Sequence, residues 1–205
     1  LDWEMWLGPA PYAPYTKDRV HFNFRWVWDY SGGILCDWGT HLFDTAQWAN
    51  DTELTGPVEL EGRGTWWEGG LYNTPKEYRV EYTYANGVKL LCDHGGNGIR
   101  FEGTDGWVEC PSWRASLQAS DPKILASKIG PTELHLYTNP QGEHRDFLDC
   151  VKTRKDPYFP VDKGHRVSTL CHLGNIALKL GRKLKWDPQA ERFPADEAAN
   201  RMLSR

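Results

Sequence analysis

The sequence has no long hydrophobic run, no block of like charges and no paired-cysteine motif, and each absence excludes a class of protein. No stretch approaches the roughly 18 apolar residues that a membrane-spanning helix needs. The 24 Lys and Arg and 28 Asp and Glu are interspersed, so a basic surface for nucleic acid or for a membrane is not expected. Five cysteines without C-x-x-C spacing predict neither a disulfide framework nor a metal site.

Nucleotide-binding motifs are missing as well. A dinucleotide-binding fold would show a strand, G-x-G-x-x-G, a helix and an acidic residue about 20 positions later. Gly62-Arg63-Gly64 and Gly96-Asn97-Gly98 both lack the third glycine, and neither a phosphate-binding loop nor a G-x-S-x-G nucleophile motif occurs. We therefore expect no cofactor to be held by this chain alone.

Length and composition predict one globular domain over residues 1–205. The chain has 40% hydrophobic residues, enough for one sizeable core. The eleven Trp and nine Tyr can either fill a thick core or stack against sugar rings. Of these two interpretations, packing in the core is the simpler one. The chain begins at Leu1 without the character of a signal peptide, so we expect a fragment or a processed product whose location, cytoplasmic or exported, stays open.

The pattern of residues predicts an α+β fold. A Pro-rich aromatic loop leads into an extended segment over 22–28, and a strand is expected near 58–67. Two hairpins follow, over 78–92 with the turn at Asn86-Gly87 and over 99–110 with the turn at Asp105-Gly106. Helical spacing marks 34–49, 143–153 and 163–180. Together these elements predict a mainly antiparallel open sheet with helices on one face, in two layers.

One predicted helix carries three proton-handling side chains. At about 100° per residue, Asp37, His41 and Asp44 fall on one stripe, and apolar residues such as Leu35 and Leu42 fall on another. Such a helix can pack through one face and meet a ligand with the other. The pair Gly32-Gly33 before it permits a sharp turn and a close approach of a ligand.

In combination, several segments resemble the carboxy-terminal domain of the Gfo/Idh/MocA oxidoreductases. The segments are residues 1–11, 25–44, 147–150, 164–166, 172–177 and 180–188, and the resemblance extends over nearly the whole chain. The resemblance implies an amino-terminal Rossmann domain, absent here, that binds NAD or NADP and supplies a catalytic lysine. It also implies a sugar or polyol site on the helix side, an open sheet that packs against another subunit, and catalytic roles for Asp37 and His41.

By this resemblance, His41 would accept the proton of a substrate hydroxyl while a hydride leaves for the nicotinamide. Asp37 would orient the imidazole or bind a neighbouring hydroxyl, and Asp44 would tune His41 from the next turn. A purely structural interpretation also stands, in which these three side chains cap or bind the preceding loop.

Other site candidates carry weaker signals. Arg25, Trp26 and Tyr30 directly precede the helix and can contact the substrate or simply pack. Tyr12 lies in a loop that can reach the pocket, and His165 begins a helix where a structural histidine is the simpler interpretation. The remaining histidines His94, His135 and His144 show no spacing typical of a metal site.

Three functions therefore remain open. The first is the substrate half of an NAD(P)-dependent sugar or polyol oxidoreductase, the second a keto-sugar lyase or hydrolase of the same fold, with or without a metal ion, and the third a sugar-binding or assembly module without chemistry. A homo-oligomer is expected in each case. If helices cover only one face of the sheet, the rings of Tyr78, Tyr82 and Tyr84 or the residues opposite need another cover, and a second subunit is the simplest one.

Overall fold

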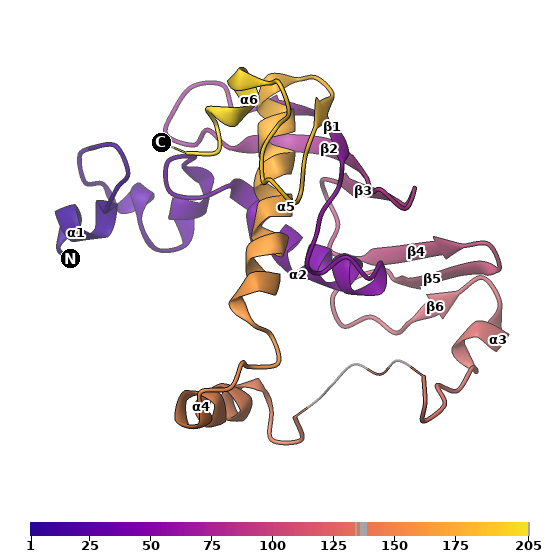
Figure 1. Cartoon of the computed structure of the whole chain (residues 1–205). Helices are drawn as coiled ribbons and strands as arrows, with labels where there is room; N and C mark the ends of the chain where they lie inside the picture. Colours follow the sequence, from indigo (N-terminus) through magenta and orange to yellow (C-terminus); the bar gives the residue numbers. More distant parts are fainter. Residues whose placement is uncertain (134, 136–138, 205) are drawn as a thin grey trace. The chain divides into compact units, whose positions relative to one another are not determined.

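The computed structural model describes residues 1–133, 135 and 139–204 (Figure 1). It divides into two compact units, Leu1–Gly95 with Arg166–Arg205, and Gly96–His165. Each unit is described by itself. In the part of the chain that is described, no helix is long and apolar enough to cross a membrane.

A four-stranded antiparallel sheet forms the centre of the first unit. The strand order is β3-β2-β1-β7, with β1 over Glu59–Trp66, β2 over Pro75–Thr83, β3 over Lys89–Asp93 and β7 over Leu184–Lys185. The turn between β2 and β3 lies at the predicted Asn86-Gly87, where Gly87 has a positive φ of 86°. Glycine meets this requirement without steric cost, so the expected hairpin is confirmed.

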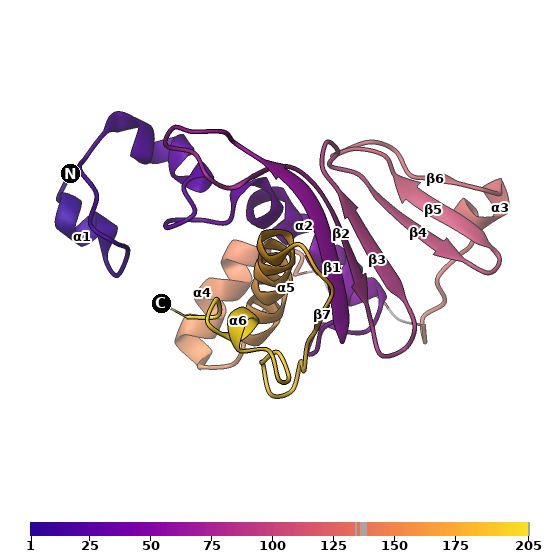
Figure 2. The same cartoon turned by 90° about the horizontal axis from the view of Figure 1, so that it is seen from above.

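Two helices cover one face of this sheet, α2 over Gly33–Ala49 and α5 over Val161–Leu180 (Figure 2). The Tyr82 hydroxyl donates to the Leu170 carbonyl at 3.1 Å, and its ring meets Phe43 edge-on at 5.6 Å. Tyr82 is fully buried, so sheet and helices share one core. The predicted α+β class and antiparallel pairing are confirmed.

The opposite face of the sheet is charged. Three ion pairs cross it, Arg79 to Asp93 at 3.1 Å, Lys89 to Glu81 at 2.5 Å and Lys183 to Glu59 at 2.6 Å. Tyr82 and Tyr84 point instead into the helix-covered core. Of the two alternatives, the rings need no second subunit as cover, because α2 and α5 bury them within the chain; a cover for the residues opposite stays a prediction.

The aromatic lead-in is not extended over 22–28, as its alternating pattern predicted. It forms α1 over Trp3–Leu7 and two 3₁₀ helices, η1 over Lys17–Arg19 and η2 over His21–Trp26. No described strand pairs with this stretch, so its backbone groups form hydrogen bonds within local turns. One example is the bond that Val27 N–H donates to the Phe24 carbonyl at 3.1 Å. The rings pack on one another, with Trp3 stacked on Trp6 at 5.0 Å.

The second unit holds a three-stranded antiparallel sheet in the order β4-β5-β6. Its elements are β4 over Ile99–Gly103, β5 over Gly106–Cys110, β6 over Gln118–Ala119, α3 over Pro122–Leu125 and α4 over Glu143–Thr153. The hairpin at Asp105-Gly106 and the helix over 143–153 occur as predicted. Short elements were missed, namely α3 and β6 in this unit, and α1, β7 and α6 over Glu197–Asn200 in the first unit.

Candidate functional site

The candidate site begins where two glycines let α2 start in close contact with its surroundings. Gly33 has a φ of 68°, and a Cβ there would lie 2.8 Å from the side chain of Thr74. A Cβ on Gly32 would lie 2.1 Å from the Cys36 sulfur. The expected close approach at this pair is therefore made by the protein's own side chains.

The two faces of α2 differ, but the buried face is shifted from the predicted one, since Leu42 is only half-buried. Leu35, Phe43 and Gln47 are buried against the sheet and α5. Asp37, His41 and Asp44 lie on the other side, with His41 exposed and both carboxylates half-buried. The stripe is therefore accessible to a ligand from outside the core.

Arg25 binds Asp37. The guanidinium Nη1 lies 2.5 Å from Asp37 Oδ2, and the two side chains are 20% and 35% exposed. The 3₁₀ turn of η2 also holds Arg25, because its Nε donates to the Phe22 carbonyl at 3.0 Å and its guanidinium lies 3.8 Å from the centre of the Phe22 ring. The sequence left contact with the substrate or simple packing open for Arg25; in the structure it binds Asp37, and contact with the substrate stays a prediction.

His41 lies one helical turn after Asp37. Its ring meets the edge of Trp38 with centroids 5.8 Å apart. Thr45 Oγ1 donates to the His41 carbonyl at 3.2 Å. The site therefore combines an exposed imidazole with a carboxylate fixed by an arginine, on one side of one helix.

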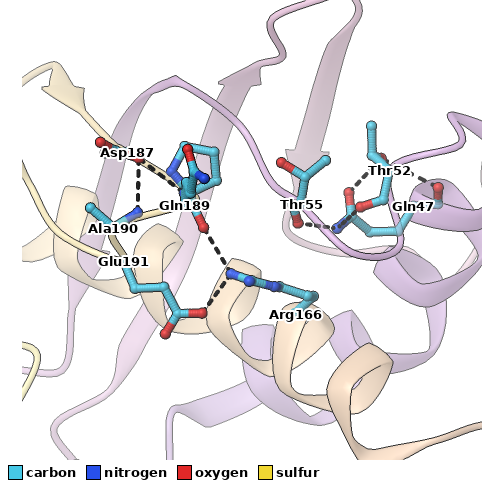
Figure 3. A network of polar contacts seen from close by, with 9 residues as sticks. Gln47, Thr52, Thr55, Arg166, Asp187, Gln189, Ala190 and Glu191 are labelled. Atoms are coloured by element: carbon cyan, nitrogen blue, oxygen red, sulfur yellow. Dashed lines mark hydrogen bonds and ion pairs between the residues drawn. The ribbon is translucent and has the colours of Figure 1, made fainter.

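A buried polar network fixes the carboxyl end of this helix (Figure 3). Gln47 Nε2 donates to the carbonyls of Thr52 and Thr55, each at 3.1 Å, and Gln47 Oε1 accepts from the Tyr84 hydroxyl at 2.6 Å. Burial raises the pKa of Tyr84 above its ordinary value. The sequence analysis missed Gln47, since nothing in its spacing marks it.

Of three other predicted residues, two line cavities and Tyr30 lines neither. Tyr12 lines a cavity of about 550 Å³ together with Arg19 and Asn73. Trp26 lines another of about 260 Å³ with Ile34, Lys76 and His94 among others. Tyr30 accepts a hydrogen bond from Arg19 at 3.2 Å and packs on Trp6, which ties it to the lead-in.

His165 is exposed in the second unit, and its role in the site stays a prediction. The neighbouring Arg166 is structural, because its Nη1 donates to the Pro188 carbonyl at 2.9 Å and to Glu191 at 2.5 Å (Figure 3). Among the residues that the structure describes, no three His, Cys, Asp or Glu side chains group as metal ligands would.

The fold is thus an antiparallel sheet backed by two helices, and the Asp37–His41 stripe lies on the outer side of one helix. The family profile described as the C-terminal alpha/beta domain of an oxidoreductase family, Gfo/Idh/MocA, matches residues 1–205. The chain belongs to this family.

Solved structures with the same fold support this assignment. They include an NAD-binding protein from Listeria innocua (TM-score 0.59, 17% identity, 81% of this chain and 51% of that one). A second is an aldose-aldose oxidoreductase from Caulobacter crescentus, complexed with glycerol, with a TM-score of 0.57 and 19% identity over 79% of this chain and 50% of that one. A third is a dehydrogenase from Bordetella pertussis in complex with NADH and UDP-GlcNAcA, with a TM-score of 0.55 and 11% identity over 80% of this chain and 48% of that one. The chain spans about half the length of these proteins, and no curated protein matches it.

Proposed function

We propose that the chain is the substrate-binding and proton-transferring half of an NAD(P)-dependent oxidoreductase that acts on a secondary alcohol of a sugar or polyol. The observation that carries this proposal is Asp37, held by Arg25 at 2.5 Å, one turn before the exposed His41. The glycerol and sugar-nucleotide complexes of similar folds support the substrate class.

Each group has a distinct task in this proposal. His41 accepts the hydroxyl proton, since an imidazole exchanges protons near neutral pH. Arg25 binds Asp37 Oδ2, so we assign Asp37 Oδ1 to a neighbouring substrate hydroxyl. The fixed carboxylate then orients the reacting alcohol toward His41, and Asp44 supports the imidazole from the next turn.

The nicotinamide nucleotide, when bound, supplies the hydride acceptor. The fold of this chain does not provide a binding site for the nucleotide by itself. Every strand pair within the described residues is antiparallel, whereas a dinucleotide-binding crevice needs parallel βαβ units. We therefore assign NAD or NADP to a Rossmann half outside the sequence given.

The first test is the mass of the native gene product from its source cells, with released small molecules identified in the same run. We expect roughly twice 23.5 kDa, because the chain covers half of the similar solved structures, together with a nicotinamide nucleotide. A native 23.5 kDa chain without nucleotide would contradict autonomous hydride transfer.

The second test uses variants of the full-length protein, assayed with a panel of aldoses and polyols. His41→Ala should lower kcat by about 10²- to 10⁴-fold, the usual contribution of a general base. Asp37→Asn should lower kcat and also raise KM. His144→Ala, at an exposed position of α4, is the matched control and should leave turnover unchanged. Normal turnover by His41→Ala would refute the assignment.

The same assay separates the other functions. Turnover that ignores added nicotinamide nucleotide but requires a metal ion indicates a keto-sugar lyase or hydrolase. Saturable sugar binding without any turnover indicates a binding module.

A homo-oligomer through the open face of the first sheet is a further part of the proposal. The ion pairs on that face make any interface there polar, so its association should weaken as salt screens the charges. Sedimentation at low and high ionic strength tests this, and a monomer under both conditions contradicts it.

A further inference from the structure

Three of the five cysteines lie in the core between α2, α5 and β3. Cys36 is in the first turn of α2, Cys171 in the middle of α5 and Cys92 on β3, and all are free thiols. Cys36 and Cys171 lie on facing turns of the two helices, because Thr40, one turn after Cys36, lies 3.8 Å from Cys171 Sγ, and Asn175, one turn after Cys171, lies 3.3 Å from Cys36 Sγ. Cys36 directly precedes Asp37 in the chain.

Polar groups surround the Cys36 sulfur. His172 Nδ1 lies 3.9 Å from it, and Asn175 Nδ2 donates to it at 3.3 Å. The same amide donates to the Gly32 carbonyl at 2.9 Å. Asn175 Oδ1 is buried without a hydrogen-bond partner, which is costly for an acceptor in the core.

The two thiols differ in accessibility. Cys36 is half-buried and Cys171 is 1% exposed. Interaction with the neighbouring Cys36 thiol, followed by burial, raises the pKa of the Cys171 thiol well above its ordinary value. Burial raises the pKa of Cys92 to about 12. Cys36 and Cys92 are both half-buried, and the imidazole of His172 lies beside the Cys36 sulfur, so we expect an oxidant to react first at Cys36.

We propose that Cys36 and Cys171 form a redox pair, in which a hydroperoxide oxidises Cys36 and Cys171 then closes a disulfide between α2 and α5. This inference concerns thiol chemistry and goes beyond the proposed function.

The reaction balances with the groups present. His172 Nδ1 takes the thiol proton of Cys36, and the sulfur attacks the terminal peroxide oxygen. The O–O bond breaks, and the leaving hydroxide takes the proton back as water (an alkoxide leaves as the alcohol). Asn175 Oδ1 can then accept a hydrogen bond from the sulfenic acid. Cys171 next attacks the Cys36 sulfur, the S–O bond breaks, and the hydroxide leaves as water with the Cys171 proton.

Thr40 holds the second thiol in place. Its Oγ1 donates its single hydrogen to the Cys36 carbonyl at 2.5 Å. The same oxygen lies 3.8 Å from Cys171 Sγ, so it accepts the hydrogen of the Cys171 thiol. Thr40 therefore links the turn of α2 that carries Cys36 to Cys171 on α5.

The test treats the protein with a few equivalents of hydrogen peroxide and counts thiols after denaturation. We expect the number of free thiols to fall from five by two. The mass should decrease by about 2 Da, and peptide mapping should find a disulfide-linked peptide pair that joins Cys36 to Cys171. In Cys171→Ser the sulfenic acid has no partner thiol, so dimedone should label Cys36. In the matched control Cys150→Ser, on α4 in the second unit, the disulfide should still form.

Other outcomes overturn the inference. These are five surviving thiols, a disulfide between Cys171 and Cys92, or dimedone on Cys110 or Cys150 while Cys36 stays reduced. Peptide mapping of the unmodified sequence decides the matter even where Cys171→Ser does not fold. None of these readouts requires oxidoreductase activity, so failure here is distinct from failure of the proposed function.

Discussion

The two compact units are stabilised in different ways. In the part of the chain that the structure describes, every buried apolar side chain lies in the first unit, and most lie in a core shared by the sheet, α2 and α5. The second unit keeps its large apolar side chains accessible, for example Phe147 at 61% and Leu148 at 52% on α4. The first unit therefore depends on tertiary packing, and the second on strand pairing and local helix formation.

The largest expected effect comes from matched leucines. Leu35→Ala, at 1% exposure, should lower the free energy of unfolding by about 2–5 kcal/mol, through lost burial and a cavity. Leu148→Ala, at 52% exposure, should change it by less than about 0.5 kcal/mol. Chemical denaturation of both variants measures the difference. Equal losses would mean that α4 is buried in solution, and the contrast between the units would fail.

A pair of glycines on α5 sharpens the same comparison. A Cβ on Gly174 would lie 2.2 Å from the Tyr82 hydroxyl and 2.9 Å from Leu35, so Gly174→Ala should destabilise by about 1–3 kcal/mol. Gly164, in the second unit, has no atom within 4 Å of such a Cβ. Gly164→Ala should therefore stabilise by up to about 1 kcal/mol through helix propensity. Melting temperatures should shift in opposite directions, and a shift in the same direction contradicts the packing described.

Alkaline pH should destabilise the first unit. Burial raises the pKa of Tyr78, Tyr82 and Tyr84 above the ordinary value of a phenol. Above about pH 10 the unfolded chain releases these protons and the native unit does not, so stability is complete below that pH and falls as pH rises. Each phenol contributes about 1.4 kcal/mol per pH unit at most.

Circular dichroism followed against pH measures this loss. Tyr78→Phe should make the decline less steep, because one phenol no longer releases a proton on unfolding. A decline of the same slope in Tyr78→Phe would show that other groups cause it.

The contrast between the units also explains which elements the sequence predicted. The two hairpins follow from Asn86-Gly87 and Asp105-Gly106, and the three long helices from the spacing of their apolar residues. These signals are local, so they required no knowledge of the rest of the chain. The strand β7 was missed because its two residues pair with Glu59 and Leu60, more than a hundred positions earlier.

The lead-in shows the opposite case, where a local pattern misled. Alternating aromatic residues over 22–28 suggested an extended segment, but a strand needs a hydrogen-bonding partner. Without one among the described residues, the chain formed η2, and this turn places Arg25 against Asp37. The arginine was named from its position in the sequence, and its role as the partner of Asp37 was not foreseen.

By itself, the sequence determined the α+β class, the antiparallel hairpins and the alignment of Asp37, His41 and Asp44 on one helix, since all of these depend on short-range periodicity. Only the tertiary structure decided which face of the sheet is covered, which side chain binds Asp37, and that Cys36 meets Cys171. These features join segments far apart in the chain, and the physical reason is that packing and desolvation choose such partners while residue spacing does not.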